Sequence, residues 1–515
     1  MTLKTNNQES LAEKVRNNAL WNAGGFLISV VISFISIPLF IKYLGDQNYG
    51  LYILLNSVMA GFGLLNFGVA PATIKFVAES TGRGDYEEAN RFINSTLCFN
   101  LIIGVAGALI IVLLASILVH DLFRIPENAR DMVLICFYWT AIGWFVSQVT
   151  QTLRAIPAAF QNFKLLIFGT TLFSALSTIL GILVLSWRGT LVNLVQANVA
   201  VSFFSVLGWF FLARSAFPNM RINFVILEWK IIKKTLRYGL WHTIGNLGWI
   251  AYSSLDKIII GIFLPPATVG YYNIAVTICS KLHAGLNSIG VILFPLISYL
   301  QGKSDSKGIY KYFINGGWII ASMASIGYLP LVLFGKSFLS IWINPIFAEK
   351  SSQVFLIVTI AYLIQASSHI RYNFLAGMGK PEWIALGSGI SGAVSVFLNI
   401  TLIPTLGLIG AGFGCFGGIV SGGILLLLIK RCFFPDKNWL EILYGMVGPI
   451  IIGLIFLVAY YTLNITININ TWLLFALVYA VTMIIVSFLI IIVDIIFFGS
   501  DQRLALILKL SKIRG

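Results

Sequence analysis

Fourteen stretches of predominantly apolar residues follow one another along this chain. One helix needs about 20 such residues to cross the hydrocarbon core of a bilayer. Of the 515 residues, 58% are hydrophobic and 10% are charged, whereas soluble domains carry about 25% charged residues. The sequence therefore predicts an all-α polytopic membrane protein. Its predicted transmembrane spans are 18–43, 50–78, 92–119, 131–153, 165–187, 190–213, 238–263, 269–299, 313–335, 351–376, 384–405, 409–429, 441–463 and 471–498.

The positive charges between these spans predict the orientation of the chain. With the N-terminus inside, 25 Lys and Arg residues fall on the cytoplasmic side, six on the outer side and three within spans. Cytoplasmic loops collect Lys and Arg, so both termini are predicted to be cytoplasmic. This distribution accounts for most of the formal net charge of +15 without a nucleic-acid partner.

The chain also matches itself at an offset of 220 residues. Gly50 recurs as Gly270, and the loop GRGDYEEANRF (82–92) aligns with GKSDSKGIYKY (302–312). We therefore expect two parallel six-helix repeats, an N-lobe and a C-lobe around a central cavity, as in one group of secondary transporters. The predicted segments are a cytoplasmic N-terminus (1–17), the N-lobe (18–213), an inter-lobe linker (214–237), the C-lobe (238–430), two extra helices (431–498) and a cytoplasmic tail (499–515).

Two segments carry a family resemblance, LWNAGGFLISVVISFISIPLFIKYLGDQNYGLYILLNSV (20–58) and LAGMGKPEWIALGSGISGAVSVFLNITLIPTLGLIGAGFG (375–414). They resemble polysaccharide exporters, the O-antigen-type flippases of the multidrug/oligosaccharidyl-lipid/polysaccharide exporter superfamily. The resemblance implies a protein of the bacterial plasma (inner) membrane that moves undecaprenyl-diphosphate-linked oligosaccharide units to the outer leaflet for O-antigen or capsule-type polysaccharide synthesis. It also implies membrane lipid as the surroundings, contacts with a polysaccharide polymerase and glycosyltransferases, and a monomeric state.

Such a cargo requires a polar, cation-lined cavity, so charges within spans are the candidate site residues. Lys281 lies 12 residues from the outer end of its span, about 18 Å deep, and is expected to face the cavity, with a structural ion pair as the alternative. Arg154 and Arg371, near the inner ends of the fourth and tenth spans, are candidates to clamp a diphosphate through bidentate hydrogen bonds. Positive-inside anchoring explains them nearly as well. Lys75 either contacts the diphosphate at the cytoplasmic mouth or extends to the interface.

Asp256 and Lys257 are adjacent charges within the seventh span. Neighbouring helix residues point about 100° apart, so their side chains are not expected to share a face. Lys257 is expected to extend outward. Asp256 then either partners Lys281 as a structural ion pair or binds a coupling proton or cation. His369 is a further candidate for ion coupling because an imidazole titrates near neutral pH.

The sequence shows no nucleotide-binding loop, nucleophile motif or metal-ligand cluster. We therefore predict neither an enzyme nor a bound cofactor or metal, and the energy source that remains is an H⁺ or Na⁺ gradient or a gradient of the substrate itself. The short outer loops argue against a glycan polymerase. Two alternatives stay open, a lipid II flippase and a cation-coupled multidrug exporter of the same superfamily. The resemblance implies twelve spans and acidic cavity residues for such an exporter. This chain has fourteen predicted spans, and its mainly basic buried charges suit an anionic cargo.

Overall fold

A computed structural model of the chain describes residues 11–223, 227–291, 293–463, 467 and 469–498, and every regular element within them is helical. The chain divides into two compact units: Met1–Asn246 with Pro265–Ala267, and Leu247–Leu264 with Thr268–Gly515. We call them the N-terminal and the C-terminal unit. The predicted tail 499–515 and the first ten residues of the predicted N-terminal segment lie outside the described residues. The segment boundaries drawn from the sequence stay predictions.

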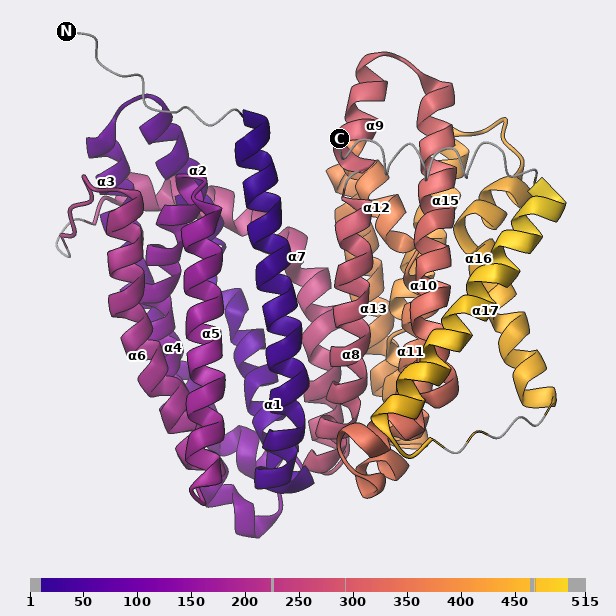
Figure 1. The fold of residues 1–515 in the computed structure, drawn as a ribbon. Helices are drawn as coiled ribbons and strands as arrows, with labels where there is room; N and C mark the ends of the chain where they lie inside the picture. The colour runs from indigo at the N-terminus through magenta and orange to yellow at the C-terminus, as the bar shows by residue number, and fades with distance from the viewer. Residues whose placement is uncertain (1–10, 224–226, 292, 464–466, 468, 499–515) are drawn as a thin grey trace, which may run out of the picture. The chain divides into compact units, whose positions relative to one another are not determined.

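The N-terminal unit is a helical bundle (Figure 1). Helix α3 packs against α4, α4 against α6, and α5 against both α1 and α6. Its core gathers buried apolar side chains from α2, α3, α4 and α6, among them Phe76, Phe92, Ile156 and Trp209. The helices are α1 (Leu11–Phe62), α2 (Val69–Gly82), α3 (Tyr86–Ile117), α4 (Glu127–Ala159), α5 (Phe163–Ser186), α6 (Leu191–Ala216) and the first part of α7 (Trp229–Phe263).

The C-terminal unit is a second helical bundle. Helix α10 packs against α11, α16 and α17, and α13 packs against α14 and α15. Phe313, Phe374, Ile429 and Met446 are among the buried side chains of its core. Its helices, after the last part of α7, are α8 (Pro266–Gly290), α9 (Leu293–Gly302), α10 (Ser306–Trp342), α11 (Pro345–Gln365), α12 (Ser368–Gly377), α13 (Pro381–Leu406), α14 (Leu408–Gly414), α15 (Gly417–Phe433), α16 (Trp439–Thr462) and α17 (Trp472–Phe498).

The two units repeat the same helix cap at the offset seen in the sequence. Asp85 precedes α3 and Asp305 precedes α10, 220 positions later. Each carboxylate accepts a hydrogen bond from a backbone N–H three residues on, that of Glu88 at 2.7 Å and that of Gly308 at 2.8 Å. Such a cap satisfies one of the donors that a helix start leaves unpaired.

The turn before each cap repeats as well. Helix α2 ends at Gly82 and helix α9 at Gly302. The residue before each capping Asp has a positive φ, 78° at Gly84 and 56° at Ser304. Helix end, turn conformation and cap therefore all recur at the predicted offset of 220 residues, and the division into two six-helix repeats stays a prediction.

Twelve helical stretches among the described residues are long and apolar enough to cross a membrane. One of them, Leu20–Asn66, covers the first predicted span and much of the second. It bends between them at Gly45, whose φ of 74° is readily adopted only by glycine. The seventh predicted span falls on α7, which is not among the twelve. The twelve apolar helical stretches nevertheless confirm the predicted multi-pass, all-α fold.

Four spans that were predicted as continuous are interrupted: 50–78, which breaks between α1 and α2, and three in the C-terminal unit. The structure breaks 269–299 between α8 and α9, 351–376 between α11 and α12, and 409–429 between α14 and α15. At the break between α11 and α12 the N–H groups of His369 and Ile370 bond carbonyl groups only three residues back. Such tightened turns interrupt an α-helix without proline. Non-helical backbone at membrane depth is tolerated where protein surrounds it.

All five cysteines lie in the described part of the chain, and none of them forms a disulfide bond. Cys98, Cys136, Cys279 and Cys415 are buried within the bundles, whereas Cys432 is exposed near the end of α15. Buried thiols in apolar surroundings are inert.

Candidate functional site

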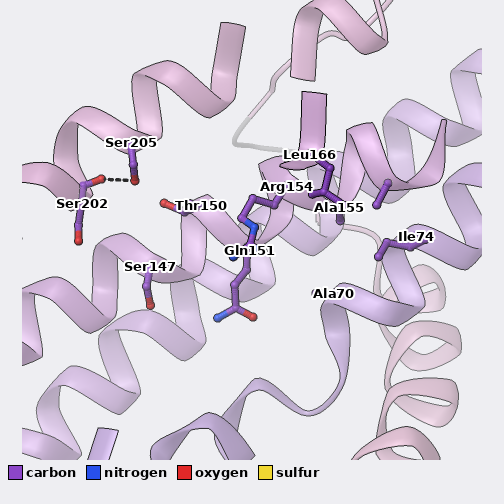
Figure 2. Close-up of a pocket in the computed structure, with 11 residues that line it drawn as sticks. Ala70, Ile74, Ser147, Thr150, Gln151, Arg154, Ala155, Leu166, Ser202 and Ser205 are labelled. Atoms are coloured by element: carbon purple, nitrogen blue, oxygen red, sulfur yellow. Dashed lines mark hydrogen bonds between the residues drawn. The ribbon is translucent and has the colours of Figure 1, made fainter. Parts of the chain in front are cut away.

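A cavity of about 590 Å³ lies within the N-terminal unit between α2, α4, α5 and α6. We call it the Arg154 cavity. It combines small apolar side chains with hydroxyl groups, one amide and one guanidinium group. Its lining residues, most of them labelled in Figure 2, are Ala70, Ile74, Ser147, Thr150, Gln151, Arg154, Ala155, Ala158, Leu166, Ser202 and Ser205.

Helix α4 supplies most of the polar lining. Ser147, Thr150, Gln151 and Arg154 recur three or four residues apart and therefore share one face of the helix. Figure 2 shows Ser147, Gln151 and Arg154 projecting from this helix. Polar side chains within a membrane span are unfavourable in contact with lipid and usually face the interior of the bundle. Here they face the Arg154 cavity.

Arg154 supplies the positive charge of the cavity. Its guanidinium carbon lies 5.5 Å from the centre of the Trp209 ring. This cation–π contact orients the planar group, which still presents N–H groups at its edge. The described lining includes no Asp or Glu. The cavity can therefore bind an anionic group at Arg154 and form hydrogen bonds with neutral polar groups beside it.

Lys75 lies outside the Arg154 cavity, although Ala70 and Ile74 of the same helix line it. Lys75 instead lines a separate groove with cations from the start of α7. The structure therefore assigns Lys75 and Arg154, predicted members of one substrate cavity, to two sites of the N-terminal unit.

Arg371 is enclosed within the C-terminal unit. It is 4% exposed, and its Nη2 donates a hydrogen bond to Ser368 Oγ at 2.7 Å. A Cβ at Gly422 would overlap this guanidinium group, so α15 passes directly over it. Nε has no hydrogen-bond partner among the described residues. The predicted clamp of Arg371 with Arg154 stays a prediction, since the two residues belong to different units.

His369 packs against a second histidine, His283. The ring centres of His283 and His369 are 4.0 Å apart. His283 also meets the ring of Tyr362 at 5.3 Å. His283 Nδ1 and His369 Nε2 lack hydrogen-bond partners within the described part of the chain. Lys281, two residues before His283, is half-buried. Its predicted place in a substrate cavity stays a prediction.

Asp256 and Lys257 form a buried ion pair with each other. Lys257 Nζ lies 3.3 Å from Asp256 Oδ1 and donates a hydrogen bond to the Ser253 carbonyl oxygen at 2.9 Å. It also lies 5.9 Å from the centre of the Tyr272 ring. The prediction that the two side chains diverge, with Lys257 extending outward, is wrong. The long lysine chain folds back along its own helix and meets the carboxylate despite the angle between the two Cα–Cβ bonds.

Sequence reasoning found Arg154 because a charge within a span is conspicuous. It missed the uncharged lining residues Ser147, Thr150 and Gln151 and the two serines of α6. The helical spacing of the three α4 residues before Arg154 was a usable signal. The serines of α6 had none, because isolated hydroxyl groups are common in membrane helices.

These features define a multi-pass membrane protein with a polar, positively charged cavity inside its N-terminal bundle. The family model described as "Polysaccharide biosynthesis protein" matches residues 15–301, more than half of the chain. The chain therefore belongs to this family. Its relatives that are named for a function are transporters or flippases rather than enzymes.

Three comparisons illustrate the relationship. The uncharacterized membrane protein EpsK of Bacillus subtilis is 22% identical, over 80% of this chain and 81% of EpsK. A Shigella flexneri protein assigned as an O-antigen transporter is 20% identical, over 81% of this chain and 98% of its own length. The structure of the lipid II flippase MurJ in an inward closed conformation superposes with a TM-score of 0.71. It is 13% identical and covers 92% of this chain and 98% of MurJ. This last likeness establishes the fold.

Proposed function

We propose that this chain is a flippase that moves undecaprenyl-diphosphate-linked oligosaccharide units from the cytoplasmic to the outer leaflet of the bacterial plasma membrane by alternating access. The Arg154 cavity carries the proposal, because it places one cation beside hydroxyl and amide groups within membrane-spanning helices. The Shigella relative assigned as an O-antigen transporter supports this cargo class.

The chemistry of the cavity matches the two polar parts of such a cargo. A guanidinium group binds phosphate oxygens through charge-assisted, often bidentate hydrogen bonds. Hydroxyl and amide groups such as those of Ser147, Thr150 and Gln151 both donate and accept hydrogen bonds, as sugar hydroxyls require. The polyprenyl tail can stay in lipid, so only the polar head needs a path. A lipid II cargo has the same polar chemistry and is the nearest alternative.

A multidrug exporter for cationic drugs is less consistent with this site. A cationic ligand would require a carboxylate or an electron-rich aromatic face as its partner. The described lining instead places the cation Arg154 in the cavity and no Asp or Glu.

We propose that an H⁺ or Na⁺ gradient drives transport, with Asp256 and His369 as candidate coupling residues. We also propose that both termini are cytoplasmic, that the chain acts as a monomer, and that a polymerase and glycosyltransferases work beside it.

A reconstituted flipping assay tests the cargo. The purified chain is placed in vesicles with a fluorescent undecaprenyl-diphosphate oligosaccharide, and an impermeant quencher reports how fast the label changes leaflet. We expect wild-type vesicles to flip the lipid faster than empty vesicles. Arg154→Gln should slow flipping by roughly 10- to 100-fold, the value of one hydrogen bond to a charged group.

The matched control is Arg130→Gln on the same helix. Arg130 Nη1 lies 3.9 Å from Glu127 Oε1, and the residue lies outside the lining. Its flipping rate should stay close to wild type. Wild-type vesicles that flip no lipid-diphosphate saccharide, but export a cationic dye along an ion gradient, would exclude the proposal in favour of drug export.

A further inference from the structure

A groove of about 550 Å³ runs along α2 and the first turns of α7, within the N-terminal unit. We call it the basic groove. Five of its lining residues are cations and two are aromatic, and the described lining contains no Asp or Glu. The lining residues are Lys75, Phe76, Lys230, Lys233, Lys234, Arg237 and Tyr238.

The sequence of α7 concentrates the charge on one face. Lys230, Lys233, Lys234 and Arg237 follow one another at intervals of three, one and three residues, so they form a single stripe along the helix. Ile231, Ile232 and Thr235 between them, and Gly239 after them, are buried in the N-terminal unit.

A close backbone contact brings this stripe beside α2. Gly68 precedes α2 and Gly239 lies on α7, and a Cβ on either glycine would overlap the backbone of the opposing segment. Because neither residue has a side chain, α7 can approach α2 closely enough for Lys75 to join the stripe.

No carboxylate of the described residues neutralises the charge of the basic groove. Within the described residues no ion pair joins any of the five cations to a carboxylate. The nearby Glu228 contacts Arg91 at 3.9 Å instead. Aromatic faces give partial compensation. Lys75 Nζ lies 4.4 Å from the centre of the Tyr238 ring, and Lys234 Nζ lies 4.5 Å from that of Phe76. Five clustered cations without a counter-ion repel one another, so an external anion would stabilise the arrangement.

The neighbouring surface suits the membrane interface. Trp229, at the start of α7, is 68% exposed, and Leu227 and Leu240 are exposed as well. Trp is enriched where a span meets the lipid headgroups. A polybasic stripe next to a span, flanked by exposed apolar side chains, is typical of segments that bind acidic lipids.

We infer that the basic groove binds the phosphate group of an acidic phospholipid from the adjacent leaflet. Apart from the Tyr238 hydroxyl group, the described lining of the groove offers no neutral polar side chain, whereas several hydroxyl groups and an amide surround Arg154, so the groove suits a glycan less well. A phosphate headgroup needs only cations, and its acyl chains can follow the exposed apolar residues. The bound lipid neutralises the stripe and stabilises α7 against α2.

Lipid binding to the purified full-length chain in an uncharged detergent tests the inference. The probes are short-chain phosphatidylglycerol, short-chain phosphatidylcholine and undecaprenyl diphosphate. The groove variant is Lys233→Gln/Lys234→Gln/Arg237→Gln. The charge-matched control is Lys303→Gln/Lys307→Gln/Lys311→Gln, which changes three exposed cations of the C-terminal unit.

We expect phosphatidylglycerol, and not phosphatidylcholine, to bind the wild type. Each cation near an anionic lipid contributes about fivefold in affinity, so the groove variant should bind roughly a hundredfold more weakly. The single variant Lys233→Gln, at an exposed side chain, should bind about fivefold more weakly and serves if the triple variant does not fold. The control should keep wild-type affinity.

Two results would overturn the inference. One is wild-type affinity of the groove variant for phosphatidylglycerol. The other is loss of undecaprenyl diphosphate binding while phosphatidylglycerol binding is unchanged, which would assign the groove to the carrier lipid. Neither binding measurement involves flipping. The lipid-binding inference can therefore fail while the flippase proposal stands, and the flippase proposal can fail while the lipid-binding inference stands.

Discussion

Replacing Asp256 by Asn removes one member of a buried ion pair and leaves the Lys257 ammonium group without its counter-charge. The side chains of Asp256 and Lys257 are only 4% and 9% exposed. In the variant Lys257 keeps its hydrogen bond to the Ser253 carbonyl group. We expect Asp256→Asn to destabilise the C-terminal unit. The double variant Asp256→Asn/Lys257→Met removes both charges and should restore stability.

The separation of the charges sets the magnitude. Two unit charges 3.3 Å apart attract by about 5 kcal/mol at an effective dielectric constant of about 20. Removing one partner of a buried pair costs about 3–5 kcal/mol, and replacing both is often neutral. The remaining contact with Ser253 favours the lower end of that range. We therefore expect a loss of about 3 kcal/mol for the single variant and less than about 1 kcal/mol for the double variant.

Thermal unfolding of the purified chain in detergent measures the difference. A loss of about 3 kcal/mol lowers Tm by roughly 6–12 °C in a unit of this size. Glu349→Gln is the matched control, because Glu349 pairs with Lys336 while their side chains are 71% and 60% exposed. Its effect should stay below about 1 kcal/mol.

The reasoning is refuted if Asp256→Asn unfolds at the wild-type temperature, or if the double variant is as unstable as the single one. A wild-type Tm combined with loss of gradient-dependent transport would instead assign a coupling role to Asp256.

Two further substitutions test other parts of the structure. Arg371→Met replaces a buried guanidinium group that has an unpartnered Nε. Thermal unfolding should show that this variant is as stable as the wild type or more stable by up to about 3 kcal/mol. A slower flipping rate in a variant of that stability would support a contact between Arg371 and the cargo. Ser304→Gly relieves a positive φ of 56° and should add about 0.5–1 kcal/mol. Gly84→Ala, in the equivalent turn, should lower Tm because φ at Gly84 is 78°. A lower Tm for Ser304→Gly, or a higher Tm for Gly84→Ala, would contradict this turn geometry.

The helices and their repetition could be predicted from the sequence because both depend on local patterns. A span needs about 20 apolar residues wherever it lies, and the capped turn at Asp85 recurs at Asp305 with the same residue type. The breaks within the C-terminal unit could not be predicted this way. The interruption at Ala366 and Ser367 contains no proline or glycine, so it depends on packing with distant helices.

The candidate site was predictable only in part. Arg154 is conspicuous as a charge within a span. Ser202 and Ser205 line the same cavity from α6, and the sequence alone does not show that α6 packs beside α4. The pairing of Asp256 with Lys257 was missed because helix geometry fixes Cα–Cβ directions and not the path of a long side chain. Lys75 was found, but its four cationic neighbours lie in the predicted inter-lobe linker, and only the fold shows that all five line one groove.

Four of the five cysteines are buried, so Cys432 is the one thiol of the native chain that a labelling reagent can reach. Maleimide reagents modify accessible thiols, so Cys432 should react while the other four are protected. A dye or spin label on Cys432 would mark the end of α15, next to Lys430 and Arg431. Membrane topology and movements of this helix end can therefore be followed spectroscopically in the unaltered sequence, without first constructing a cysteine-free background.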